Sequence, residues 1–126
     1  MKKIVATGGV VLIAIAALWY ISSIKTKTSV DQIVQDGHTI VITEDGLIPD
    51  TLTVSLGTTV RFVNNDEYWH WPASDPHPSH TFYPELDPKA PIKPGATWEF
   101  IASKSGTWGI HDHLAPYITG TMTVTQ

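Results

Sequence analysis

Seven of the nine prolines lie between positions 72 and 94, and this stretch constrains the fold more than any other feature. Proline fixes φ and lacks a backbone donor, so no helix of ordinary length is expected there. Outside it, EDGLIPD at 44–50 predicts a turn, and TLTVSL at 51–56 alternates apolar and polar residues. Similar segments are HTIVIT at 38–43, VRFVNN at 60–65, TWEFIA at 97–102, TWGIHDH at 107–113 and TGTMTVTQ at 119–126. The pattern predicts an all-β antiparallel sandwich or barrel.

The N-terminus has a different character. Between Lys3 and Lys25 lie 21 uncharged residues, long enough at about 1.5 Å per residue to span a hydrocarbon core of about 30 Å. A cleaved signal peptide is the alternative, with Ala14–Ala16 as a cleavage region. We favour a single uncleaved transmembrane helix, because the apolar run continues past that region to Trp19 and Tyr20, which suit a membrane interface.

The chain therefore divides into three predicted parts. Residues 1–24 form a membrane anchor or signal segment, residues 25–37 a stalk or the start of the first strand, and residues 38–126 the folded domain. We expect that domain on the periplasmic or extracellular side of a membrane. The chain has no cysteine, so disulfides and thiolate metal ligands are excluded. A net charge of −4 gives no basic patch and argues against a nucleic-acid partner.

Three parts of the sequence together resemble one family. The run at 42–66, the PGATWEF segment at 94–100, and GTWGIHDH with ITGTMTV near the C-terminus are similar to the cupredoxins, the plastocyanin-like copper proteins. The resemblance covers residues 38–126 and implies a Greek-key β-sandwich that binds copper at one end.

The ligand pattern implied by the resemblance is only partly present. Blue copper members place their first histidine in N-N-x4-H, which matches Asn64, Asn65 and His70. Their second element, C-x-x-H-P-x-M-x-G, is aligned here on its proline and glycine. The positions of its cysteine, histidine and methionine are then occupied by Asp112, Ala115 and Ile118. Without a thiolate, a blue copper centre is excluded.

Histidines elsewhere offer a replacement site. Strand alternation places His111 and His113 on one face and Asp112 on the other, and the H-x-H element resembles one found in multicopper oxidases. The proline-rich connection adds His77 and His80 in HPSH, and the following TFYP run would anchor His80. Predicted metal ligands are therefore His80, His111, His113, His77 and His70.

Several of these residues also have structural explanations. In the structural explanation, His111 and His113 are polar residues solvated on an exposed strand face. His70, which lies between two tryptophans, is then a buried histidine bonded to backbone. Three roles are open for Asp112: binding the metal, orienting a ligating imidazole, or capping the following turn. We favour the last two roles. The acidic residues around the connection would attract cations or simply be solvated.

Imidazole donors suit copper or zinc, and the resemblance favours copper, as Cu(II) or Cu(I), over zinc. The predicted function is a membrane-anchored, extracytoplasmic protein with a non-blue, type 2-like copper site for copper handling. Its expected partners are the membrane, through the N-terminal helix, and a copper-handling or redox protein. A redox-active copper protein in electron transfer and a metal-free partner-binding module are the alternatives. No residue spacing indicates nucleophilic hydrolysis, so a binding protein is favoured over an enzyme.

Overall fold

The computed structural model describes residues 30–126, of which Ile33–Gln126 form one compact unit. The predicted anchor at 1–24 and the first part of the predicted stalk lie outside the described residues. Among residues 30–126, no helix is long and apolar enough to cross a membrane. A 3₁₀ helix, η1 (Val34–Asp36), precedes the first strand.

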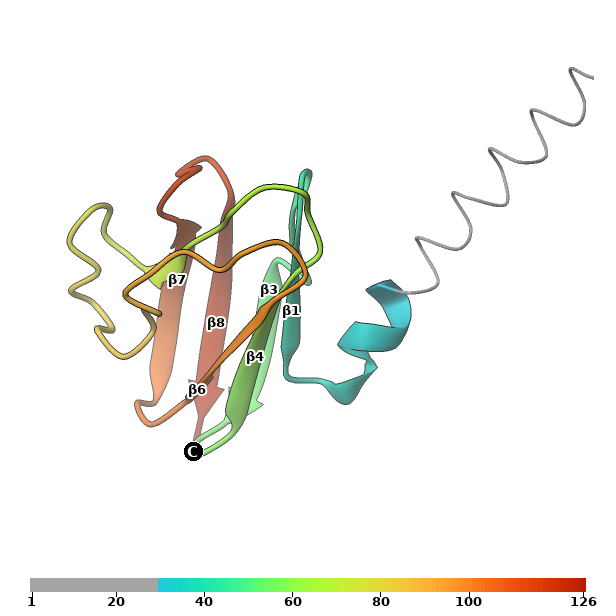
Figure 1. Cartoon of the computed structure of the whole chain (residues 1–126). Helices are drawn as coiled ribbons and strands as arrows, with labels where there is room; N and C mark the ends of the chain where they lie inside the picture. Colours follow the sequence, from blue (N-terminus) through green and yellow to red (C-terminus); the bar gives the residue numbers. More distant parts are fainter. Residues whose placement is uncertain (1–29) are drawn as a thin grey trace, which may run out of the picture. The chain divides into compact units, whose positions relative to one another are not determined.

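Within residues 30–126, eight strands form two four-stranded sheets (Figure 1). Most strand ends agree with the alternating segments of the sequence. The first sheet has the order β2-β1-β4-β6 and the second β3-β8-β7-β5. The strands are β1 (Thr39–Thr43), β2 (Gly46–Ile48), β3 (Thr51–Ser55), β4 (Thr59–Asn64), β5 (Pro72–Ser74), β6 (Thr97–Ile101), β7 (Gly106–Asp112) and β8 (Thr119–Thr125). The predicted all-β sandwich is confirmed.

The expectation of purely antiparallel pairing is wrong, because both sheets are mixed. Strand β1 runs parallel to β4, and β3 runs parallel to β8. Parallel neighbours need a connection that crosses over, and here strands of the opposite sheet provide it. Between β1 and β4 the chain turns back along β2 and passes through β3 in the second sheet. Local alternation carries no signal of this return path.

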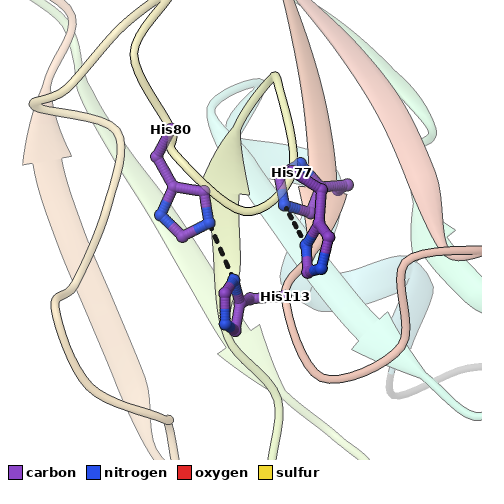
Figure 2. Close-up of side chains that lie close together, drawn as sticks. His77, His80 and His113 are labelled. Atoms are coloured by element: carbon purple, nitrogen blue, oxygen red, sulfur yellow. Dashed lines mark hydrogen bonds between the residues drawn. The ribbon is translucent and has the colours of Figure 1, made fainter.

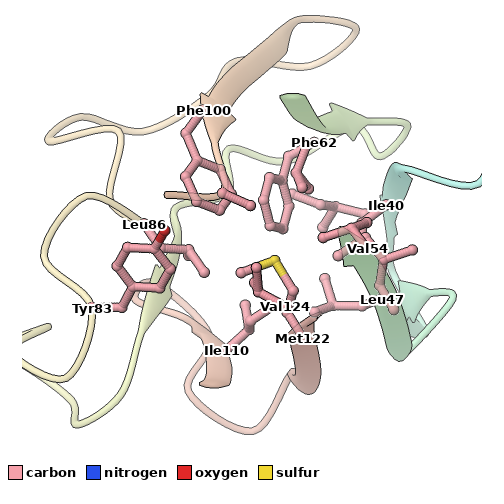
Figure 3. Close-up of a cluster of buried hydrophobic side chains, with 14 of the residues drawn as sticks. Ile40, Leu47, Val54, Phe62, Tyr83, Leu86, Phe100, Ile110, Met122 and Val124 are labelled. Atoms are coloured by element: carbon pink, nitrogen blue, oxygen red, sulfur yellow. The ribbon is translucent and has the colours of Figure 1, made fainter. Parts of the chain in front are cut away.

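Inward-facing residues of both sheets build the core between them (Figure 3). Alternation is clear in β4, where Val60 and Phe62 are fully buried, and in β8, where Met122 and Val124 face inward. In β7, Ile110 is part of the core, so its neighbour His111 lies on the opposite face of the sheet. This placement confirms the predicted parity of the H-x-H strand.

Strands β2 and β5 were not predicted. Each has only three residues; β2 lies inside a segment predicted as a turn, and β5 begins with Pro72. As an edge strand, β5 tolerates a residue without an N–H. The following chain covers this edge, since Ser74 N donates to Leu86 O at 2.9 Å, and His70 forms a bridge with Ile92.

The connection between β5 and β6 contains no helix, as the prolines predicted. Its aromatic segment fixes it to the domain, because Tyr83 and Leu86 are fully buried. The hydroxyl of Tyr83 accepts hydrogen bonds from Ser103 N at 2.8 Å and Lys104 N at 3.1 Å. The HPSH segment just before Tyr83 is thereby held beside β7.

Candidate metal centre

Four histidines from two segments of the chain lie close together. Figure 2 labels three of them, His77, His80 and His113. His77 and His80 come from the connection after β5, and His111 and His113 come from the end of β7 and the residue just beyond it. Each offers one ring nitrogen, and these four nitrogens all lie within 4.8 Å of one another. We call this group the histidine cluster.

Two spacings within the histidine cluster are close to those of a metal coordination shell. His80 Nε2 lies 2.9 Å from His113 Nδ1, and His77 Nδ1 lies 3.3 Å from His111 Nε2. With metal–nitrogen bonds of about 2.0–2.1 Å, adjacent nitrogens lie about 2.9 Å apart in a square plane and about 3.3 Å apart in a tetrahedron. Four neutral imidazoles at this spacing form a donor set suited to Cu(II) or Zn(II).

Two carboxylates orient two of the imidazoles. The Nδ1–H of His80 donates to Asp87 Oδ2 at 2.7 Å, and the Nδ1–H of His111 donates to Asp75 Oδ1 at 2.9 Å. A proton fixed on Nδ1 leaves the lone pair on Nε2, the nitrogen that each of these rings turns toward the histidine cluster. Carboxylate–histidine pairs of this kind are typical of metal sites, where they fix ring orientation and raise ligand basicity.

Gly109 makes the contact between Asp75 and His111 possible. A Cβ atom at Gly109 would lie 2.0 Å from Asp75 Oδ2, so any side chain there would displace the carboxylate. The backbones are also joined, because Asp75 N donates to Gly109 O at 3.1 Å. A glycine inside a strand lacks side-chain packing, and at this position its use is to admit a neighbouring carboxylate.

Asp87 is held more firmly than Asp75. Burial alone would raise the pKa of its carboxyl, but hydrogen bonds from His80, Trp71 and Lys89 outweigh burial and lower the pKa well below its usual range. The Trp71 Nε1–H donates to Asp87 Oδ1 at 2.8 Å. Asp87 therefore stays ionised beside His80 as an acceptor of the ring proton.

The backbone of His80 is unusual because its φ of +55° lies in the left-handed region. A residue with a Cβ pays a conformational penalty there, and such penalties concentrate at functional sites. His80 is 4% exposed and carries its ring between Asp87 and His113. The loop thus keeps a strained conformation that directs this ring into the histidine cluster.

His113 is kept in the state that a metal needs. Burial, followed by repulsion from His80, His77 and His111, lowers the pKa of His113 from its ordinary value. The neutral imidazole is thereby favoured, and only the neutral form can donate a lone pair. Its ring packs against Trp71 with centroids 4.7 Å apart.

His70 lies outside the histidine cluster. Its Nδ1 contacts Asp112 Oδ2, and its Nε2 lies 2.8 Å from Asp66 Oδ2, so both ring nitrogens already have carboxylate partners. Asp112 also accepts hydrogen bonds from Trp71 N at 3.0 Å and Leu114 N at 2.9 Å through Oδ1. Asp112 therefore caps the turn after β7, as favoured from the sequence, and the imidazole that it orients is His70.

The model of one family, described as the cupredoxin-like domain, matches residues 11–124 of this chain. The chain belongs to the cupredoxin-like family. Solved cupredoxin structures agree with this assignment in fold. They include the purple cupredoxin from Nitrosopumilus maritimus, with 20% identity over 69% of this chain and 98% of that one and a TM-score of 0.57. A comparison with curated proteins gives no match.

Two further solved structures with comparable similarity to this chain come from different kinds of protein. Oxidised plastocyanin from Dryopteris crassirhizoma is 24% identical over 69% of this chain and 99% of that one, with a TM-score of 0.54. The copper-containing nitrite reductase from Thermus scotoductus SA-01 is 21% identical over 70% of this chain, with a TM-score of 0.57, and the match spans 22% of that protein. At these identities the likeness shows the fold.

Within the cupredoxin-like family this chain is atypical. The resemblance places a blue-copper cysteine at Asp112 and a first ligand at His70, and here those two residues contact each other. The four converging histidines lie instead on the HPSH connection and the H-x-H element. Four further residues of this region were not predicted from the sequence as parts of the site: Trp71, Asp75, Asp87 and Gly109.

Of those four, the two aspartates and Gly109 left a signal in the sequence. The aspartates belong to an acidic surround, which indicates no partner for either one. A glycine between Trp108 and Ile110 inside a strand marks a close approach, which would have pointed to Gly109. Trp71 gave no signal beyond its position next to His70.

Proposed function

We propose that this protein binds one copper ion through His77, His80, His111 and His113 and that its task is copper handling. The observation that supports this most directly is the convergence of four imidazole nitrogens within 4.8 Å of one another. Two of the rings already have carboxylate partners, and the pKa of a third is lowered. Two of the ligands are thus oriented, and a third is favoured in its neutral form, before an ion arrives.

Copper is favoured over zinc for two reasons. Divalent copper binds a given nitrogen site more tightly than zinc does. The nitrite reductase that shares this fold is described as copper-containing. Because the chain has no cysteine, the site would be nitrogen-rich and only weakly coloured, as type 2 copper is.

The cellular setting completes the proposal. Residues 1–24 would anchor the protein in a membrane, with the cupredoxin-like domain on the periplasmic or extracellular side. There it would sequester copper, buffer it or pass it to another copper-handling or redox protein. Protease protection of the domain in sealed vesicles, compared with its digestion in opened ones, tests this orientation.

Copper titration of the full-length chain without a histidine tag, purified in a mild detergent, tests the binding. We expect saturation at one equivalent of Cu(II), nitrogen splittings in the electron paramagnetic resonance spectrum, and no strong visible absorption. The variants His111→Ala and His113→Ala should each lose tight binding. His38→Ala is the matched control, because His38 contacts Asp36 and lies outside the histidine cluster.

The opposite outcomes are equally informative. Retention of tight copper binding in both strand variants would exclude the histidine cluster as the site. Absence of any saturable copper or zinc signal in the natural chain would favour the metal-free partner-binding alternative. A fold check by circular dichroism accompanies each variant, so that a lost site is distinguished from a lost structure.

Redox cycling at the same ion is the second candidate. The observation that favours it is the anchoring of His80 and His111 by carboxylates, because rings held in place limit the rearrangement between Cu(I) and Cu(II). Voltammetry of the copper-loaded protein tests it. A reversible one-electron wave would support electron transfer, and irreversible loss of copper on reduction would favour handling alone.

A further inference from the structure

The four histidines of the cluster are held to different degrees. Three have supports beyond their contacts with one another: His80 bonds to Asp87, His111 bonds to Asp75, and the ring of His113 packs on Trp71. For His113 the backbone is fixed as well, since its N–H donates to Trp71 O at 2.7 Å. These three rings form what we call the anchored set.

His77 has no comparable support within residues 30–126. Its one side-chain hydrogen bond there is the 3.3 Å contact between its Nδ1 and His111 Nε2. That contact joins two prospective ligand atoms, so an ion between them would replace it. No carboxylate oxygen bonds to the His77 ring in the described part of the chain, in contrast to His80 and His111.

The backbone explains why His77 differs. Phe82 N donates to Asp75 O at 3.0 Å, and His80 N donates to Pro76 O at 2.9 Å, so hydrogen bonds close the loop on both sides of its tip. The tip itself, residues 77–79, is exposed, whereas His80 and His111 are 4% and 2% exposed. The loop therefore presents His77 at the solvent boundary of the histidine cluster.

We infer that His77 is the exchangeable ligand of the site and that its coordination position accepts an external nitrogen or anionic donor. This inference rests on the proposed copper function. The anchored set holds the ion, the bond between copper and His77 Nδ1 breaks, and a bond from copper to the incoming donor forms. No electron moves, and the displaced imidazole keeps its own lone pair. An acceptor's ligand or a small solute can take this position without entering the buried side of the cluster.

Two small donors, imidazole and azide, serve as probes of this position in the full-length protein. We expect His77→Ala to bind one equivalent of Cu(II) no more than about tenfold more weakly than the natural chain, because water takes the vacated position. Added imidazole should restore a fourth nitrogen to the resonance spectrum of that variant, and azide should produce a new charge-transfer band. Chelators should remove its copper faster than from the natural chain.

His111→Ala and His113→Ala provide the matched comparison within the anchored set. Both should lose tight binding, and neither should be restored by imidazole at the concentration that restores His77→Ala. Because His77 is exposed, its replacement is compatible with the fold, which a thermal melt checks. Gln at position 77 provides a second variant of similar polarity.

The failure of this inference is distinguishable from failure of the copper function. If the natural chain binds copper but His77→Ala and His77→Gln lose it as fully as His111→Ala does, all four ligands are equivalent and the inference is wrong. The inference is also wrong if imidazole leaves the spectrum of His77→Ala unchanged. If the natural chain binds no copper, the proposed function itself is wrong, and this inference falls with it.

Discussion

Two histidine-containing groups in this domain, the one around His70 and the histidine cluster, use carboxylates in opposite ways. At His70, Asp66 and Asp112 occupy both ring nitrogens. In the histidine cluster, Asp87 and Asp75 each occupy one nitrogen of His80 and His111, and the other nitrogen faces the neighbouring imidazoles. Two carboxylates occupy both nitrogens of the His70 ring, whereas one carboxylate orients the ring and leaves its second nitrogen available.

The comparison also separates the copper positions expected from the family resemblance from the candidate metal centre. The resemblance assigns His70 and Asp112 to the copper-binding positions of blue cupredoxins. In this chain their side chains bond to each other and tie the β4–β5 connection to the end of β7. The candidate metal centre lies instead on the outer face of β7, on the residue just beyond it and on the loop that covers it.

Replacing His70 gives the largest expected effect on stability. The change His70→Ala leaves Asp112, which is 1% exposed, without its partner, and breaking a buried pair in this way costs about 3–5 kcal/mol. We expect the free energy of unfolding in urea to fall by that amount while the copper stoichiometry stays at one. His111→Ala should show the reverse pattern. Loss of copper in His70→Ala, with the fold intact, would make His70 a ligand and break the comparison.

A substitution at Gly109 tests the arrangement in which a ring has one carboxylate partner, as His111 has Asp75. We expect Gly109→Ala to displace the Asp75 carboxylate and weaken copper binding by about 10- to 100-fold, the usual effect of losing a carboxylate that orients a ligating histidine. Isothermal titration against a competing chelator measures the change.

A double-mutant cycle sharpens this prediction. If the glycine acts only through the carboxylate, adding Gly109→Ala to Asp75→Ala should weaken binding no further than Asp75→Ala alone. Asp75→Asn retains an oxygen acceptor for His111 and should lose less. Additive effects of the two changes would show that Gly109 matters for another reason.

Acid should destabilise the region around His70, whose ring has two carboxylate partners. Burial alone would raise the pKa of Asp66, but hydrogen bonds from His70 and from Glu67 N outweigh it and lower the pKa. A lowered folded-state pKa means that this stabilisation is complete above the ordinary aspartate value of about 3.9 and is lost as the pH falls through the folded value. We therefore expect Asp66→Asn to flatten the dependence of stability on pH in this acid range.

The smallest expected effect comes from Trp71. The change Trp71→Phe keeps an aromatic ring beside His113 and removes one donor to Asp87, which retains His80 and Lys89. One hydrogen bond is worth about 0.5–1.5 kcal/mol, so copper binding should weaken about 2- to 10-fold. Trp98→Phe, which packs against the core, is the control. A complete loss of binding in Trp71→Phe would mean that the indole holds the whole loop.

Local patterns were sufficient for most of the fold. Alternation in TLTVSL and VRFVNN placed β3 and β4, and the prolines excluded a helix between β5 and β6. Strand β2 was not predicted, because three residues are too few to show an alternating pattern. The parallel pairing of β1 with β4 depends on a return path that no local segment encodes. Leu56, expected to continue the apolar face of β3, lies beyond the strand and is 48% exposed.

The histidines of the site were predictable from their spacing in the sequence and from the strand face on which alternation places them. The H-x-H element and HPSH identified all four histidines that converge. Their carboxylate partners were not assignable, because Asp75 and His111 are 36 residues apart and meet only when β5 pairs with β7. His70 was grouped with the ligands from the N-N-x4-H spacing alone. That spacing gives no sign that two aspartates would occupy its ring.

The covering of β5 by the chain that follows it has a consequence for how these domains behave at high concentration. An uncovered sheet edge offers unpaired backbone groups on which a strand from another molecule can add, and this is a common start of aggregation. Here Pro72 removes one donor from the edge, and the N–H groups of Ser74 and His70 donate to the protein's own Leu86 and Ile92. The connection that presents the histidines therefore also covers the β5 edge against a strand from another copy.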